Sequence, residues 1–225
     1  MKDNLVTKRE EESDPNYGKP PSERTIQELL NTGIVDIDKP AGPTSFQVTE
    51  YVKKILNVSK AGHAGTLDPG VSGVIVIGLN DGTKILKSLL EAPKEYICLM
   101  RLHDKVELDE IKKSLRTFTS KLFQTPPVRA AVIRTLRIRE IYEIQHLEKS
   151  GKDVLFRVSS ESGTYIRRLC HDIGLALGVG AHMQQLRRTK TGPFDESTLV
   201  TLHDLADAFV SWKENGEEKY LRNVV

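Results

Sequence analysis

The chain has few cysteines and no long apolar run. Cys98 and Cys170 are the only two cysteines among 225 residues, and both fall in apolar periodic segments without paired spacing. We therefore expect two reduced core residues rather than a disulfide or a metal pair. No stretch approaches the ~18 apolar residues that a membrane-spanning helix needs, and the polar N-terminus lacks the apolar centre of a secretory signal. These absences favour a globular, cytoplasmic protein with no membrane partner.

Several catalytic motifs are also missing. In GLNDGTK (residues 78–84) the glycine and the lysine are separated by Thr83, which breaks the P-loop pattern and leaves ATP use unsupported. The histidines are scattered, and His171 lies in an apolar-faced helix without companion ligands, so we predict no metal site. The next acid after Asp68 is Asp81, beyond an apolar run, so the sequence does not show the paired carboxylates of a glycosidase.

Helical and extended patterns alternate irregularly along the chain. Apolar periodicity and capping residues predict helices over residues 25–30, 44–56, 84–90, 107–118, 164–177 and 201–216. Alternating or continuous apolar runs predict strands over residues 33–38, 74–79, 95–102, 130–147 and 153–160, and the run at 74–79 is typical of a strand buried on both faces. Because there is no strict β-α-β rhythm, we expect an α+β protein with a mixed sheet and flanking helices.

Positive charge is concentrated in two places although the net charge is only +2. These are VRAAVIRTLRIRE (residues 128–140) and QQLRRTKTG (residues 184–192). A basic stripe can bind phosphates, but a charge run is more often a solvated face. Candidate RNA contacts in these stretches are Arg129, Arg134, Arg137 and Arg188.

One acid is set among glycines in GHAGTLDPGVSG (residues 62–73). Pro69 disfavours the helical conformation at Asp68, and the glycines let the backbone approach a bulky ligand closely. The loop therefore presents the carboxylate. Asp-Pro-Gly is also a common turn tripeptide, so these residues alone leave a purely structural turn open.

Five motifs in fixed order resemble the TruB-type family of RNA pseudouridine synthases. They are DKPAGPTSF (residues 38–46), GHAGTLDPGVSGVIVIGL (62–79), KEY (94–96), SGTYIRRLCHDIG (162–174) and HMQQLRRTKTGPF (182–194). TPPVRAAVIRTLRIREIYEI and GLALGVGAHM are similar to the archaeal and eukaryotic dyskerin branch, the catalytic subunit of H/ACA guide-RNA particles. The resemblance implies the pseudouridine synthase fold, with a mainly antiparallel central sheet.

The resemblance also implies roles for individual residues. Asp68 is expected to be the nucleophile that attacks the target uridine, Arg167 its ion-pair partner and Tyr96 the aromatic ring that stacks on the uracil. His63 matches a histidine that helps to displace the target base, Lys39 and Thr66 support the loop, and Leu186 and Arg187 fall in a motif near the cleft. No cofactor is expected, because isomerisation involves no net redox or hydrolysis.

The implied context is an H/ACA particle containing guide RNA, substrate RNA and small accessory proteins, one with a zinc-ribbon-like fold, and no DNA. We expect a polar N-terminal extension over residues 1–33, a catalytic domain over residues 34–225, and no PUA domain after it, as in a truncated chain of archaeal source. Arginine-rich strands at about residues 129–139 would form a mobile thumb that clamps RNA. Two alternatives stay open: a stand-alone transfer RNA T-loop pseudouridine synthase, and a non-catalytic RNA-binding scaffold.

Overall fold

The protein is described here from a computed structural model that covers residue 14 and residues 18–126 and 135–225. Its helices are α1 (Ile26–Thr32), α2 (Ser45–Ile55), α3 (Leu86–Glu91), α4 (Leu108–Thr117), α5 (Ile166–Ala176), α6 (Leu202–Asn215) and α7 (Glu218–Val224), with 3-10 turns η1 (Pro21–Glu23) and η2 (Asn80–Ile85). Its strands are β1 (Ile34–Lys39), β2 (Ala61–His63), β3 (Ser72–Leu79), β4 (Lys94–Leu102), β5 (Lys121–Gln124), β6 (Arg137–Ser150), β7 (Asp153–Ser160), β8 (Ala181–Thr191) and β9 (Phe194–Asp195).

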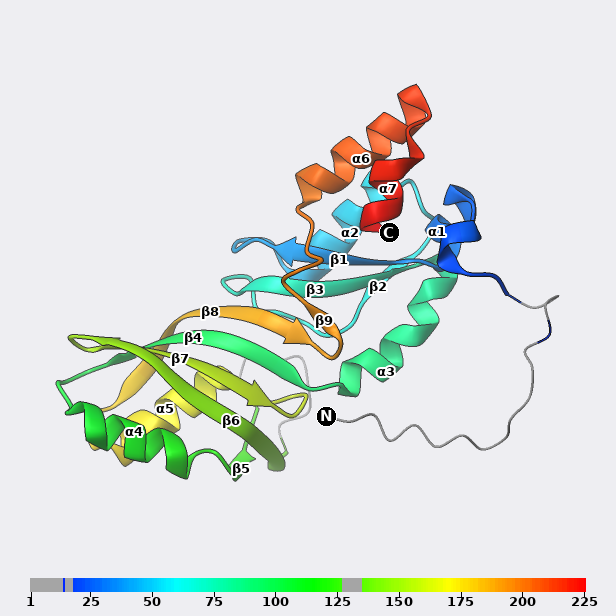
Figure 1. The fold of residues 1–225 in the computed structure, drawn as a ribbon. Coiled ribbons are helices and arrows are strands. Elements are labelled where there is room, and N and C mark those ends of the chain that lie inside the picture. Colours follow the sequence, from blue (N-terminus) through cyan, green and yellow to red (C-terminus); the bar gives the residue numbers. More distant parts are fainter. Residues whose placement is uncertain (1–13, 15–17, 127–134) are drawn as a thin grey trace.

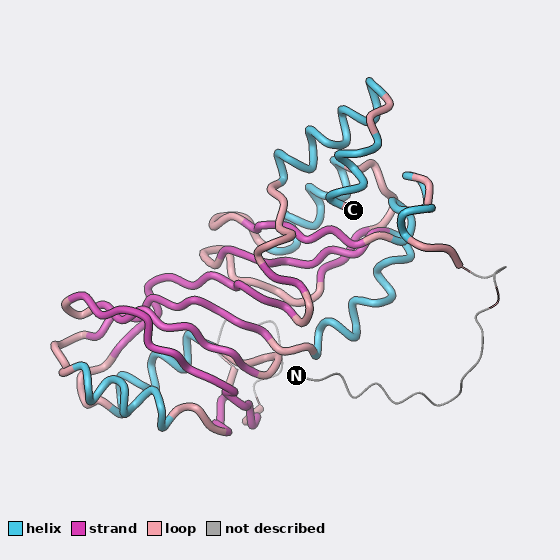
Figure 2. The backbone as a smooth tube through the Cα atoms, in the orientation of Figure 1, coloured by secondary structure: helices cyan, strands magenta, loops and turns pink. Residues whose placement is uncertain are grey.

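The strands form one sheet in the order β1-β3-β8-β4-β7-β6-β5, with β2 paired to β3 and β9 to β8. Neighbouring strands are antiparallel except β3 and β8, which are parallel over two residue pairs, Ser72↔Arg187 and Gly73↔Arg188. Helices lie along both ends of this long sheet (Figure 1), and Figure 2 shows the continuous run of strands between them. The predicted α+β class with a mainly antiparallel sheet is confirmed.

Two hydrophobic clusters divide the sheet into halves. The first half packs β1 and one face of β3 against α1, α2, α6 and α7. The other face of β3, with Val74 and Val76, packs against Ala64 and Leu86. This arrangement confirms the prediction of a strand buried on both faces, and it holds the Gly-rich loop that precedes β3.

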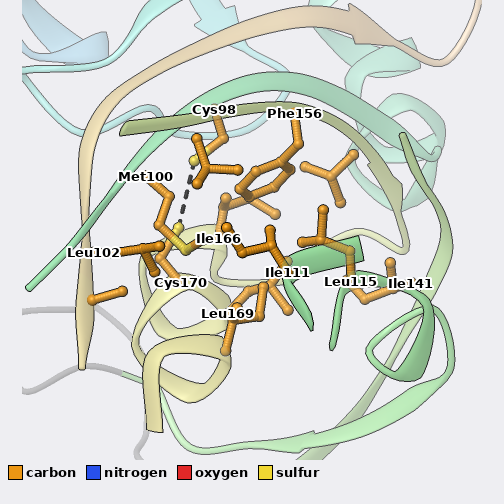
Figure 3. Packing of buried hydrophobic residues seen from close by; sticks show 14 of the residues in the cluster. Cys98, Met100, Leu102, Ile111, Leu115, Ile141, Phe156, Ile166, Leu169 and Cys170 are labelled. Carbon is orange, nitrogen blue, oxygen red and sulfur yellow. Dashed lines mark hydrogen bonds between the residues drawn. The ribbon is translucent and has the colours of Figure 1, made fainter. Parts of the chain in front are cut away.

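The second half packs β4, β6 and β7 against α4 and α5. Phe156 is fully buried there, and burying a side chain of this size contributes about 1.5–3 kcal/mol. Cys98 and Cys170 are free and buried, as predicted, and their sulfurs lie 3.4 Å apart, which ties β4 to α5 (Figure 3). No local pattern predicts this contact, since the two cysteines are 72 residues apart.

Helix ends follow the capping residues closely. Thr25 and Thr201 each form the expected capping box, with Glu28 and Asp204, and Gly216 ends α6 in the left-handed region at φ 73°. Ile26, Leu29 and Leu30 of α1 are buried in the first cluster, so residues 26–33, expected within a polar extension, pack as part of the body of the protein.

Five of these strands and helices were not anticipated: β2, β5, β8, β9 and α7. No strand was predicted for β8, yet it pairs with both β3 and β4; its sequence lacks apolar alternation because arginine and threonine occupy buried positions. The longest described helix, α6, has 14 residues, and in the described ranges no helix has the length and apolar character needed to cross a membrane.

Candidate active site

The exposed carboxylate of Asp68 is the centre of the site. The loop between β2 and β3 turns at Asp68, where the Val71 N–H donates to the Asp68 carbonyl at 3.0 Å. The side chain is 54% exposed and forms an ion pair with the Arg167 guanidinium, itself 47% exposed. The predicted pair, 99 residues apart in sequence, is therefore brought together. The carboxylate is therefore accessible to a ligand while a guanidinium holds it from one side.

Lys39 supports this loop from inside the protein. Its side chain is fully buried, and its Nζ donates to the carbonyls of Pro40 at 2.9 Å, Pro69 at 3.2 Å and Val71 at 2.7 Å. Burial lowers the pKa of Lys39 from its ordinary value, as does nearby Arg188, while Asp68 opposes the shift. The ammonium thus binds the backbone on both sides of Gly70. Lys39 supports the loop, and its burial keeps it out of direct contact with substrate.

Arg188 supports the same loop from β8. Its Nε donates to the Val74 carbonyl at 2.8 Å and its Nη2 to the Gly65 carbonyl at 3.2 Å. Arg188 is only 1% exposed, so the prediction that it contacts RNA is wrong: its guanidinium is used inside the protein. Gly73 is fixed by this packing, because a Cβ there would lie 2.1 Å from the Arg188 carbonyl oxygen, and its φ is +100°.

Arg187 points to the opposite face of β8. It donates to both carboxylate oxygens of Asp38, at 2.9 and 3.0 Å, and to Glu196 at 2.6 Å. The Asp38 carboxylate raises the pKa of Arg187 further above its ordinary value, with a smaller contribution from Glu196. Arg187 therefore connects β8 to β1 across β3, with its guanidinium bound to two acids.

Tyr96 lies on β4 in register with Arg188 of β8. Its side chain is half-buried against the second cluster. Because alternate residues of a strand share a face, Tyr96 lies on the same face as Cys98, which contacts Cys170 of α5. Tyr96 and the helix that carries Arg167 therefore lie on the same side of the sheet, and the stacking role of Tyr96 stays a prediction.

His63 is half-buried at the end of β2. Its Nδ1 is buried and has no hydrogen-bond partner among the described residues. Burial lowers the pKa of His63, and the charge of Arg188 lowers it further, so the ring is neutral at pH 7. Thr66 is exposed on the loop, whereas Leu186 is half-buried opposite Cys98.

The other predicted RNA contacts are only partly placed. Arg137 begins β6 in register with Gln124 and is half-buried. Arg129 and Arg134 lie outside the described residues, as does most of the proposed thumb. Over the described part of the chain, no group of three or more His, Cys, Asp and Glu side chains is placed to hold a metal ion.

Two polar residues near the site were not singled out from the sequence. Lys94 is buried, and its Nζ donates to the carbonyls of Leu89 at 3.0 Å, Leu90 at 2.7 Å and Ala92 at 2.6 Å. Burial is the main cause that lowers the pKa of Lys94 to about 8. A lysine at the start of an apolar strand was the available signal. Gln124, at the end of the unpredicted strand β5, had none.

Family comparisons agree with this geometry. Residues 53–166 match the N-terminal domain of the TruB family pseudouridylate synthases. The chain belongs to the TruB family. Residues 167–225 match the C-terminal domain of tRNA pseudouridylate synthase B, and residues 1–49 match the DKCLD domain. The resemblance inferred from the five motifs is confirmed.

Curated relatives and solved structures support the assignment. The chain is 53% identical over 223 residues to a "Probable tRNA pseudouridine synthase B" of Archaeoglobus fulgidus, covering 99% of this chain and 69% of that protein. A counterpart in Methanothermobacter thermautotrophicus is 51% identical over 222 residues, covering 99% of this chain and 68% of that protein. Among solved structures, a Cbf5-Nop10-Gar1 complex contains a chain with a TM-score of 0.91 and 53% identity, covering 95% of this chain and 65% of the other.

An H/ACA RNP bound to a substrate RNA containing 2′-deoxyuridine contains a chain with a TM-score of 0.87 and 50% identity, covering 95% of this chain and 64% of the other. The chain thus spans about two thirds of the length of these relatives. Its likeness to the curated relatives covers 99% of this chain.

Proposed function

We propose that this protein isomerises specific uridines in RNA to pseudouridine, with Asp68 as the nucleophile. The observation that supports this most directly is the Asp68–Arg167 ion pair, placed on an exposed loop that Lys39 and Arg188 hold from beneath. In a member of the TruB family, this arrangement supplies an accessible carboxylate on a loop that is held by buried hydrogen bonds.

The chemistry needs few groups. The Asp68 carboxylate forms a bond to the target uridine, and the N1–C1′ bond breaks. The detached uracil rejoins C1′ through C5 and the bond to the carboxylate breaks, so that Asp68 is regenerated. The C5 hydrogen leaves to solvent as a proton, and N1 takes up a proton in its place. Arg167 orients the carboxylate through its ion pair. Tyr96 offers an aromatic face to a base that has left its stack, and His63, being neutral, can enter the space that the base vacates without bringing a charge.

The proposed setting is an H/ACA guide-RNA particle in which this chain is the catalytic subunit and acts on ribosomal RNA, with transfer RNA as a second substrate. The likeness to a Cbf5-Nop10-Gar1 complex and to an H/ACA RNP with substrate RNA supports guide RNA and small accessory proteins as partners. We further propose that one of these accessory proteins has a zinc-ribbon-like fold, and that the protein works in the archaeal cytoplasm.

A second candidate is modification of transfer RNA without a guide. The names of the curated relatives, "Probable tRNA pseudouridine synthase B", favour it. The two candidates share the catalytic site and differ only in how the RNA is delivered to it.

The test is tritium release from RNA labelled at C5 of uridine, because pseudouridine formation expels that hydrogen. A guide-plus-target pair and bare transfer RNA are compared, each with and without the accessory proteins. Release that requires guide and partners supports the particle, whereas release from bare transfer RNA supports the stand-alone enzyme.

Asp68→Asn tests the nucleophile. We expect it to abolish tritium release while RNA affinity stays within a few-fold, because the amide preserves shape but cannot attack. Asp81→Asn is the matched control, since Asp81 is an exposed acid paired with Lys84 outside the site, and it should keep full activity. Full activity in Asp68→Asn refutes the assignment. Intact RNA binding without release in any wild-type reaction would favour a non-catalytic scaffold.

A further inference from the structure

Gln124 is a buried amide whose side chain, within the described part of the chain, hydrogen-bonds to the backbone of one residue. It is the last residue of β5 and is only 2% exposed. Its Oε1 accepts from the Tyr165 N–H at 3.0 Å, and its Nε2 donates to the Tyr165 carbonyl at 3.4 Å. Since buried polar groups are costly when unpaired, this side chain is committed to the position of Tyr165.

Tyr165 is the residue from which α5 begins. It occupies the N-cap position, and its own side chain makes no capping hydrogen bond. Its carbonyl accepts from the N–H groups of Arg168 and Leu169, both at 3.0 Å, which starts the helix. Arg167 is two residues further on. Gln124 therefore fixes the start of the helical turn that carries the partner of Asp68.

The neighbouring strand β6 holds the same segment at its other end. Arg139 donates to Glu161 at 3.2 Å, and Glu161 accepts from the Glu140 N–H through its side chain at 3.1 Å while its own N–H donates to the Glu140 carbonyl at 2.8 Å. Gly163 packs on Arg139, because a Cβ there would lie 3.1 Å from its Nε. Residues 161–165 are thus fastened to β6 at one end and to β5 at the other.

The two members of the ion pair are held by different parts of the fold. The Asp68 loop is anchored by Lys39 and Arg188, whereas Arg167 is carried by a helix that packs in the other hydrophobic cluster. A productive geometry needs both groups placed within a fraction of an ångström, and a misplacement of about 1 Å can cost ~100-fold in rate.

We propose that Gln124 is a positioning residue that directs Arg167 toward Asp68 by fixing Tyr165 at the start of α5. This inference rests on the proposed function. The proposal gives the strand pair β5–β6 a part in catalysis. Among the described residues, no side chain of either strand hydrogen-bonds to the ion pair itself, and the effect is transmitted through Tyr165.

The test is the rate of tritium release at saturating RNA in the wild-type assembly that proves active. Gln124→Met keeps the length of the side chain but removes both hydrogen bonds, and we expect kcat to fall roughly ten- to a hundredfold with KM and RNA affinity unchanged. Gln124→Glu keeps an oxygen acceptor for the Tyr165 N–H at a helix start, where negative charge is favourable, and should restore most of kcat.

Ile111→Val is the control for lost stability, because it trims the same core cluster from α4; it should keep kcat at a similar melting temperature. If Gln124→Met does not fold, Gln124→Asn replaces it, since it keeps the amide but shortens its reach by one methylene. A wild-type kcat in a folded Gln124→Met or Gln124→Asn variant overturns this inference, as does an equal loss of kcat in Ile111→Val. In either case the proposed function still stands. Absence of tritium release from every wild-type assembly overturns the proposed function and this inference with it.

Discussion

Asp36 is expected to make the stability of this protein fall as pH rises. It lies on β1 and is 7% exposed, and its Oδ2 accepts from Thr198 at 2.9 Å, whereas its Oδ1 is buried without a partner in the described part of the chain. Burial raises the pKa of Asp36 from 3.8 to about 6, against the effect of the Thr198 hydrogen bond and with a further rise from nearby Asp195.

The sign follows from the direction of the shift. Between the unfolded and folded pKa values the folded state binds the proton more tightly, so the stabilising contribution is complete below about pH 4 and is lost as pH rises through about 6. A shift of about two units corresponds to up to about 3 kcal/mol, at 1.36 kcal/mol per unit. For a domain of this size that is roughly 6–10 °C in melting temperature.

Asp36→Asn isolates this contribution, because its amide oxygen can accept from Thr198 but cannot ionise. Urea unfolding is measured at about pH 4 and about pH 7.5 for both proteins, and the variant should gain up to about 3 kcal/mol on the wild type over that interval. Asp81→Asn is the control with the opposite sign. The Lys84 hydrogen bond lowers the pKa of exposed Asp81, so the unfolding free energy of this variant should fall relative to that of the wild type as pH rises. Parallel pH curves for Asp36→Asn and wild type would refute the reasoning.

Two further predictions concern the loop that carries Asp68. Gly73→Ala places a Cβ against the Arg188 carbonyl at a φ of +100° and should destabilise the fold by about 3 kcal/mol or more. The control is Gly70→Ala, which has nothing within 4 Å of its Cβ and should change the free energy of thermal unfolding by less than about 0.5 kcal/mol. Similar melting temperatures for the two variants would contradict this prediction. Lys39→Met removes the three hydrogen bonds that this buried ammonium donates. It should lower the unfolding free energy by about 2 kcal/mol and also lower the rate of tritium release. A variant with a lower melting temperature but the wild-type rate at low temperature would show that the loop does not need this lysine.

The sequence was sufficient where a local pattern determines the structure. Apolar periodicity located α2, α4, α5 and α6, and the box residues Thr25 and Thr201 located two helix starts. The ordered motifs identified Asp68 and Arg167, which the structure brings into contact. The helices were predicted from patterns that span only a few residues, whereas the two site residues were predicted from the resemblance to a family.

The sequence was insufficient where long-range contacts decide. Arg188 and Arg187 are adjacent and equally basic, yet one is buried and the other is half-exposed beside Asp38. The burial of Arg188 depends on the parallel contact between β8 and β3, which no local pattern in Gln184–Gly192 reveals. Gln124 was missed for a similar reason, since its partner Tyr165 is 41 residues away.

The two arginines of β8 have structural contacts on both faces of this basic segment. Successive residues of a strand point to opposite faces, so Arg187 and Arg188 hold the junction between the two halves of the sheet from both sides. One crosses to Asp38 of β1, and the other holds the carbonyls of Gly65 and Val74 around the catalytic loop. The direct β3–β8 pairing at this junction extends over only two residue pairs. These side chains therefore supply much of the rigidity that keeps Asp68, from one half, opposite Arg167, from the other.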